Sequence, residues 1–492
     1  MKSGCMLACV ALLMRSVSLA FNAYITDRVG AEGMGLLSLT MSVYGFAVTF
    51  ATAGVALAVT RLVASALGRA EGARARRVMR AAVVYALAFG GAAALCLYFG
   101  SDFIATRLLS DIRTRASLRL LSLSLVPIAL SAVYSGYFIA VRRVVHNAAT
   151  QVFEQCVRIL LTFGGLAIAA DNVELACLAL VGGSSLAELF SFFLLFLQAK
   201  IDLVRHRLSG GETGGEGKAV FGYAFPCAVS AQLRSGLVTV QHLLIPYALA
   251  LGGAARGEAL ASYAALHSMA LPVVLFPTAI LASFSGLLVP ECAELDGVGN
   301  KKRLSRLSKI ALFGALAFAS LSAAILFVGA DTLGLSIYDS AEAGRYIKML
   351  APLVPVMYMD SVVDAHLKGL GYQVYSMGVN IADAAASVLG VLLLLPRFGA
   401  DGYIYVIYIT ELLNFALSIG KLARLIPLPR TLRFWSVAPV CATVSAAFAL
   451  VFMKGEGVFH MILCALAVLG IYTVLLLCLE KNKNKNALFA DL

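Results

Sequence analysis

Gly68-Arg-Ala-Glu-Gly-Ala-Arg-Ala-Arg-Arg77 runs directly into an apolar segment at 79–99, and this pairing of a basic turn with a long apolar stretch decides the fold. About 20 apolar residues in a helix cross the hydrocarbon core of a bilayer. The 492 residues are 61% hydrophobic and 13% charged, which is typical of membrane proteins. We therefore predict one all-α, polytopic membrane protein with 14 transmembrane helices, near 4–26, 35–64, 79–99, 117–140, 150–170, 174–198, 219–250, 259–290, 307–330, 346–370, 375–395, 402–424, 432–453 and 458–479.

Charge between these spans alternates from loop to loop. Of 39 Lys and Arg residues, 25 lie on the side of the N-terminus, 9 on the opposite side and 5 within spans. Cytoplasmic loops of membrane proteins carry the excess of basic residues, so both termini are predicted to be cytoplasmic. The net charge of +12 therefore indicates topology and contact with anionic lipid, and nucleic acid is excluded as a partner.

An internal repeat divides the spans. A shift of 228 residues places Pro127 on Pro355 and overlays the basic run 68–77 on 296–305. Because six spans form an even number, the two halves enter the membrane from the same side, and their pseudo-two-fold axis lies along the membrane normal. We predict two parallel six-helix lobes able to rock about a central cavity, with these bounds: 1–198 for the N-terminal lobe, 199–218 for a polar cytoplasmic linker, 219–424 for the C-terminal lobe, and 425–492 for two appended helices and a tail.

Basic residues inside the spans are candidates for binding a substrate. An ionised side chain at the bilayer centre costs about 2.5–3.5 kcal/mol on insertion scales and needs a partner or a wet cavity. Arg15 and Arg234 lie near the middle of corresponding spans in the two halves, and Arg61 lies nearer the cytoplasmic end of its span. Guanidinium groups facing a central cavity suit an anionic substrate, a diphosphate above all.

Acidic residues inside the spans give the opposing interpretation. Asp360 and Asp364 share one face of their span, Asp383 lies on the next, and Glu411 is alone in the middle of another. These four carboxyl groups are candidates for gating or ion coupling. Alternatively, the aspartates pair with Arg15 and Arg234 and hold the lobes together in one state.

Signatures of enzymes and of metal sites are missing from the sequence. It contains no Walker loop, HExxH or GxSxG motif, and its ten cysteines form no CxxC pair. We expect no enzyme activity, no metal and no cofactor, with transport driven by an H⁺ or Na⁺ gradient or by the membrane potential.

Three stretches carry a family resemblance: Ile25-Thr-Asp-Arg-Val-Gly-Ala-Glu-Gly-Met-Gly-Leu36, Thr52-Ala-Gly-Val-Ala-Leu-Ala-Val-Thr-Arg-Leu-Val-Ala64 and Met269-Ala-Leu-Pro-Val-Val-Leu-Phe-Pro277. They resemble segments of stage V sporulation protein B and related polysaccharide flippases. The resemblance implies membership of the multidrug/oligosaccharidyl-lipid/polysaccharide exporter superfamily, which includes the lipid II flippase.

The resemblance also bears on site residues. In the lipid II flippase, arginines of spans one, two and eight line the cavity, and Arg15 matches the first of them. Phe21 and Leu266 stand at two other cationic positions, so the full cationic set is absent. Asn22 occupies a position where many sporulation-type members are basic, and His267 follows Leu266. We count Asn22 and His267 as candidate substrate-binding residues, His267 also as a candidate proton relay.

Two transport functions, and a less favoured third class, follow as expectations. The first is a flippase that moves an undecaprenyl-diphosphate-linked saccharide, a precursor of cell wall, spore cortex or polysaccharide, from the inner to the outer leaflet. The second is a cation-coupled multidrug exporter. The third is a scaffold that recruits cell-wall synthases. The expected location is the bacterial plasma membrane, and the expected partners are lipid-linked saccharide, membrane lipids and cell-wall synthases.

Overall fold

The computed structural model is helical almost throughout, as expected from the sequence. It describes residues 2–52, 54–68, 71–141, 143–169, 173–205, 216–253, 255–429, 431–452, 455 and 457–481, and none of these residues forms a strand. The described helices make the chain an all-α, multi-pass membrane protein.

Eleven described helical stretches are long and apolar enough to cross a membrane. Two of them, Leu12–Leu67 with 56 residues and Gln373–Leu425 with 53, each contain two of the spans predicted from the sequence. In the first stretch the chain bends at Gly30, with φ 76° and ψ 168°, and in the second at Gly399, with φ 60° and ψ −145°. Residues other than glycine rarely adopt this backbone conformation, which explains why both bends fall at glycine. Gly54, where α1 (Lys2–Thr52) gives way to α2 (Val55–Gly68) in the first stretch, also has a positive φ of 70°. The number of fourteen spans stays a prediction.

Packing separates the chain into two compact units. Unit 1 contains Met1–Met34 and Leu244–Leu492, and unit 2 contains Gly35–Leu243. The two changes from one unit to the other fall within helices, in α1 (Lys2–Thr52) and in α7 (Glu216–Leu251). These boundaries differ from those of the sequence repeat, whose two six-span halves stay a prediction.

Unit 2 is a bundle in which small residues bring helices close together. Gly136 lies against the backbone of Ala56, and Gly183 lies against Thr162, at distances where any added side chain would collide. Close approach at small residues is how helices associate in membranes. Besides parts of α1 and α7, unit 2 contains α2 (Val55–Gly68), α3 (Gly72–Phe103), the π-helix η1 (Ile104–Leu108), α4 (Thr114–Ala140), α5 (Val144–Ala169) and α6 (Val173–Arg205).

Unit 1 contains the remaining helices. These are α8 (Arg256–Ala264), the π-helix η2 (Ala265–Ala270), α9 (Leu271–Leu275), α10 (Thr278–Gly297), α11 (Lys301–Tyr338), α12 (Ala341–Leu350), the 3-10 helix η3 (Ala351–Leu353), α13 (Val354–Gly369), α14 (Gln373–Leu425), α15 (Leu432–Phe452) and α16 (Val458–Lys481).

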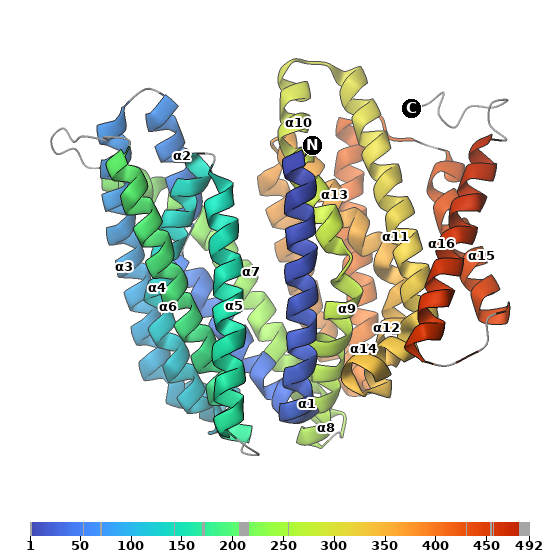
Figure 1. Cartoon of the computed structure of the whole chain (residues 1–492), viewed down its shortest axis with the longest axis horizontal. Coiled ribbons are helices and arrows are strands. Elements are labelled where there is room, and N and C mark those ends of the chain that lie inside the picture. The colour runs from blue at the N-terminus through green and yellow to red at the C-terminus, as the bar shows by residue number, and fades with distance from the viewer. Residues whose placement is uncertain are drawn as a thin grey trace. The chain divides into compact units, whose positions relative to one another are not determined.

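The last two helices pack on the rest of unit 1 through one apolar cluster. Helices α15 and α16 lie side by side against α11 (Figure 1). Ala324, Cys441 and Val468 are buried where the three meet. The hydroxyl of Tyr472 donates to the carbonyl of Ala317 at 2.8 Å, which adds a polar contact between α16 and α11.

The predicted linker 199–218 lies partly outside the described residues. Helix α6 continues to Arg205, and α7 begins at Glu216. The basic tail 482–492 also lies outside the described part of the chain.

Candidate functional site

Span eight is interrupted twice, and proline explains both places. Pro272 has no N–H to give to the carbonyl four residues earlier, at Ser268, where the π-helix η2 stands. Pro277 ends the short helix α9 in the same way before α10 begins at Thr278. Interrupted helices leave backbone polar groups that other parts of a membrane protein must satisfy.

The N-terminal arm of α1 supplies a partner at the first interruption. The amide of Asn22 donates to the carbonyl of Ser268 at 2.6 Å and lies 3.5 Å from the hydroxyl of Tyr338. Asn22 therefore satisfies the carbonyl that Pro272 cannot. The structure places this predicted substrate-binding residue at a backbone break in span eight.

Arg15 reaches the second interruption from the same face of α1. It precedes Asn22 by seven residues, which is two helical turns. Its Nη1 donates to Thr278 Oγ1 at 3.1 Å, and Tyr358 is close enough to interact with its charge. Within the described residues Arg15 forms no ion pair, so the alternative, a pairing of Arg15 with Asp360, Asp364 or Asp383, does not occur there. Its remaining N–H donors are available to another acceptor.

Tyr358 closes the break from the other side. Its side chain is fully buried, and its hydroxyl donates to the carbonyl of Val274 at 2.6 Å, close to the Pro277 break. Arg15 thus joins α1 to α10 through Thr278, and Tyr358 joins α13 to α9 through Val274.

His267 lies within η2, at the first break. Its ring stacks on Tyr263, with centroids 5.3 Å apart and planes inclined by 12°. Leu266 and Ser268 on either side of it are buried. The structure thus places His267 in the packed wall of span eight, beside the Asn22 contact.

The four predicted carboxylates come together in unit 1, on α13 and α14. Asp364 forms an ion pair of 2.5 Å with Lys368 and accepts a hydrogen bond from Ser376. Asp360 lies one turn earlier, within electrostatic range of Asp364 and Asp383, and Glu411 lies within range of Asp360 and Asp383.

The bend in α14 at Gly399 explains this meeting. Asp383 lies before the bend and Glu411 after it, so the two arms of one long helix bring both carboxyl groups to Asp360. Oδ1 of Asp360 is buried and has no hydrogen-bond partner among the described residues, although Ser418 interacts with the same carboxyl group. The described residues include no group of three or more His, Cys, Asp or Glu side chains placed to hold a metal ion.

The other two predicted residues belong to unit 2. Arg61 lies over the ring of Tyr223, 4.8 Å from its centroid, which is a favourable cation–π distance. Arg234 is exposed, and within the described residues of unit 2 it has no hydrogen-bonded or ion-paired partner. It is free to meet an anion.

Several partners of the site were not predicted from the sequence. Thr278, Tyr338 and Tyr358 hold the α1 arm at span eight, and Ser376 and Ser418 contact the carboxylates. The carbonyl four residues before Pro272 was the available signal for the Asn22 contact. Hydroxyl groups carry no such signal, because Ser and Thr satisfy themselves within many helices.

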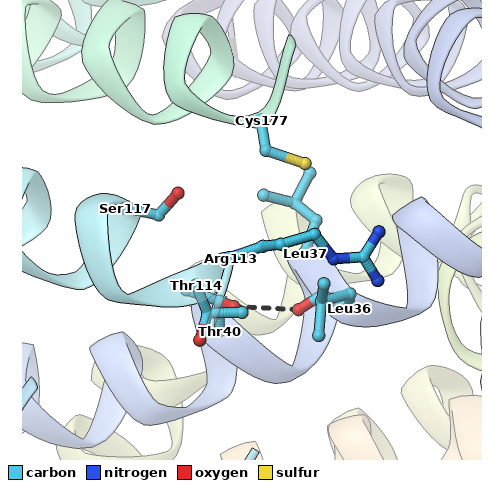
Figure 2. A pocket seen from close by; sticks show the side chains of 7 residues that line it. All are labelled: Leu36, Leu37, Thr40, Arg113, Thr114, Ser117 and Cys177. Carbon is cyan, nitrogen blue, oxygen red and sulfur yellow. Dashed lines mark hydrogen bonds between the residues drawn. The ribbon is translucent and has the colours of Figure 1, made fainter. Parts of the chain in front are cut away.

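Two cavities lie away from these residues. The first, in unit 2, holds about 20 Å³, enough for one water molecule; Figure 2 shows it between Ser117, Cys177, Thr40 and the stem of Arg113. The second, in unit 1, holds about 370 Å³ between α11, η3, α13 and α15. Its lining is mostly Ala, Pro, Phe and Leu, so it can accept an apolar chain but not a charged group.

A bundle of long apolar helices, with one interrupted span and ionisable side chains inside the spans, defines this protein as a multi-pass helical membrane protein. Residues 1–209 match the family described as Polysaccharide biosynthesis protein. Over 473 residues the chain is 25% identical to stage V sporulation protein B of Bacillus subtilis (strain 168), covering 91% of this chain and 89% of that protein. The resemblance drawn from the sequence is thereby confirmed.

Solved structures agree on the fold. The lipid II flippase MurJ in an inward closed conformation matches with a TM-score of 0.76 at 12% identity, over 97% of this chain and 99% of that one. An inward-facing multidrug resistance MATE family transporter of the MOP superfamily matches with a TM-score of 0.64 at 13% identity, over 85% of this chain and 98% of the other. The chain therefore has a fold of flippases and exporters.

Proposed function

We propose that this protein is a flippase that moves a diphosphate-linked saccharide on an undecaprenyl carrier from the inner to the outer leaflet by alternating access. Arg15 and Arg234 bind the diphosphate, and Arg61, Asn22 and His267 contribute to the headgroup site. The protein is proposed to act in the bacterial plasma membrane with both termini cytoplasmic, as a transporter and not an enzyme. The similarity to stage V sporulation protein B and the MurJ fold support this proposal.

One observation carries the proposal. Arg15 lies inside a span, yet its partner is the neutral hydroxyl of Thr278 and not a carboxylate. A guanidinium without a countercharge is costly in a bilayer unless water or an anionic ligand reaches it. Diphosphate oxygens match its fork of donors.

The test is the transport of lipid-linked saccharide in Arg15→Ala. Losing one charge-assisted hydrogen bond, worth about 1.5–3 kcal/mol, lowers the rate by about 10- to 150-fold. Arg15→Lys keeps the charge without the fork and should retain part of the activity. The transport rates of both variants are measured in vesicles of equal protein content, as the amount of lipid-linked saccharide that reaches the outer leaflet over time.

Arg28→Ala is the matched control, because Arg28 lies on the same helix, is exposed and lies over the ring of Tyr24 at 5.8 Å. Its transport rate should equal that of the wild type. Unchanged transport in Arg15→Ala would remove the diphosphate site from the proposal.

Ion coupling is proposed for the carboxylates of unit 1. Asp360, Asp364, Asp383 and Glu411 interact with one another, and Lys368 is ion-paired with Asp364. Binding of H⁺ or Na⁺ would relieve their mutual repulsion. In Asp360→Asn, transport should lose its dependence on the ion gradient while binding of the lipid-linked saccharide persists. A gradient dependence equal to that of the wild type contradicts this role.

The acidic cluster also favours the second candidate, a cation-coupled exporter of amphipathic drugs. The similarity in fold to MATE transporters supports it. A pH jump that moves an organic cation in proteoliposomes, with no competition from lipid-linked saccharide, would favour the exporter. Movement of the saccharide without movement of the cation favours the flippase.

A further inference from the structure

A second charged cluster lies in unit 2, apart from the residues proposed above. Glu154 and Arg158 are one turn apart on α5, and Glu188 lies on the neighbouring helix α6. Nη2 of Arg158 is 2.5 Å from Glu154 and 3.4 Å from Glu188. One guanidinium therefore contacts two carboxyl groups.

Close helix packing creates this meeting. On one side of the cluster Gly183 lies against Thr162, and beyond it Gly165 lies against Ala179, so α5 and α6 approach at small residues. The side chains of Glu154, Glu188 and Arg158 are 19%, 22% and 28% exposed. The cluster is thus held by the backbones of two tightly packed helices and not by long, mobile side chains.

The two carboxyl groups contact the same guanidinium nitrogen and interact electrostatically with each other. Arg158 neutralises one carboxylate, and a second negative charge in the bilayer is costly, so one proton makes the cluster neutral.

Two neighbouring polar groups, Tyr44 and Gln155, carry no positive charge. Tyr44 on α1 interacts with all three charged members, and its hydroxyl hydrogen-bonds to Ser124 of α4 at 2.5 Å. Gln155 accepts from Nη1 of Arg158 at 3.3 Å. Tyr44 is a further titratable group that interacts with the cluster.

We propose that Glu154 and Glu188, held by Arg158, share one exchangeable proton and form a proton-binding site of unit 2. The site is independent of the carboxylates in unit 1. It goes beyond the proposed transport of lipid-linked saccharide, because it stands whether the cargo is that lipid or a drug.

Infrared spectroscopy of the purified full chain in lipid discs tests the proposal. A protonated carboxyl group has a carbonyl band that ionised carboxylates lack. The wild type should show such a band at neutral pH that disappears as the pH is raised, and Glu188→Gln should lose it. Glu411→Gln, which changes a carboxyl group of unit 1, should keep this band.

Glu154→Gln separates a shared proton from simple burial. With Glu154 gone, Glu188 and Arg158 form a neutral pair, so Glu188 ionises and the band is lost. If Glu188 were protonated merely because it is buried, its band would persist in Glu154→Gln, and that result overturns the proposal.

A second measurement needs no variant. Dicyclohexylcarbodiimide adds to protonated carboxyl groups in apolar surroundings to give an N-acylurea, which mass spectrometry locates. We expect adducts on Glu154 or Glu188 of the wild type, with a yield that falls about tenfold per pH unit above the midpoint. A wild type with neither a pH-dependent band nor an adduct has two permanently ionised carboxylates, which also overturns the proposal.

Discussion

Tyr358 shows how single hydroxyl groups hold the broken span. It is fully buried, and its bond of 2.6 Å to Val274 satisfies a carbonyl close to the Pro277 break. Removing one partner of a buried hydrogen bond costs more than the bond contributes, because the other partner stays desolvated.

Tyr358→Phe should therefore lower the free energy of unfolding by about 1–3 kcal/mol. Thermal denaturation in detergent measures the loss. Tyr405→Phe is the matched control, since Tyr405 is 46% exposed and its hydroxyl has no partner among the described residues. Equal melting temperatures for the two variants would mean that Val274 does not depend on Tyr358.

At the scale of residues, the sequence identified the charged residues of the site better than the neutral groups that they contact. Arg15 and Asp360 stood out because ionised residues are rare in spans, whereas the neutral hydroxyl of Thr278 did not. Asp364 was predicted to share a face with Asp360, whereas its ion pair with Lys368, one turn further along the same helix, was not predicted.

At the scale of elements, two glycines determine where long helices bend. Gly30 and Gly399 have positive φ with ψ near ±150–170°, a region that is essentially limited to glycine. The sequence located both bends between predicted spans, because polar residues interrupt the apolar runs there. It could not indicate that the helix resumes directly after each glycine.

Gly30→Ala should destabilise the protein by about 1–3 kcal/mol through backbone strain alone, since a Cβ there would meet no atom within 4 Å. Gly45→Ala on the same helix is the control. A Cβ at Gly45 also meets nothing within 4 Å, and its φ is not positive, so alanine should raise stability by about 0.5–1 kcal/mol. Opposite shifts in melting temperature are expected, and shifts of one sign would exclude strain as the cause.

Helix bends also explain why the acidic cluster was only half predicted. The position of Asp360 and Asp364 on one face follows from their spacing of four residues in a helix. The approach of Glu411 to Asp383 depends on the return of α14 after Gly399, which no local pattern reports.

At the scale of the whole molecule, the predicted orientation awaits a test. Basic residues favour a cytoplasmic position for the turn before α11 and an outer position for the turn before α4. In a cysteine-free background, Ile112→Cys should react with a membrane-impermeant maleimide in intact cells. Lys302→Cys should react only after the cells are opened. Reversed labelling would invert the topology, and labelling of both in intact cells would exclude the fourteen-span arrangement.

The units show a limit of sequence reasoning about whole molecules. The 228-residue register compares positions along the chain, whereas packing depends on which helices touch. Arg15 and Asn22 bond to span eight, so the first span belongs with unit 1 although the register groups it with spans two to six.

Unit 2 is one continuous stretch, 35–243, inserted into a unit 1 that is split between the first 34 residues and everything after 243. During synthesis unit 2 can therefore be completed first, while the N-terminal arm waits. Arg15 and Thr278 are 263 residues apart, and at about 5–20 residues per second the ribosome needs about 13–50 s to make that stretch. For that time Arg15 has no Thr278 to bind. The first helix must therefore enter the membrane with a charged side chain whose partner has not yet been translated.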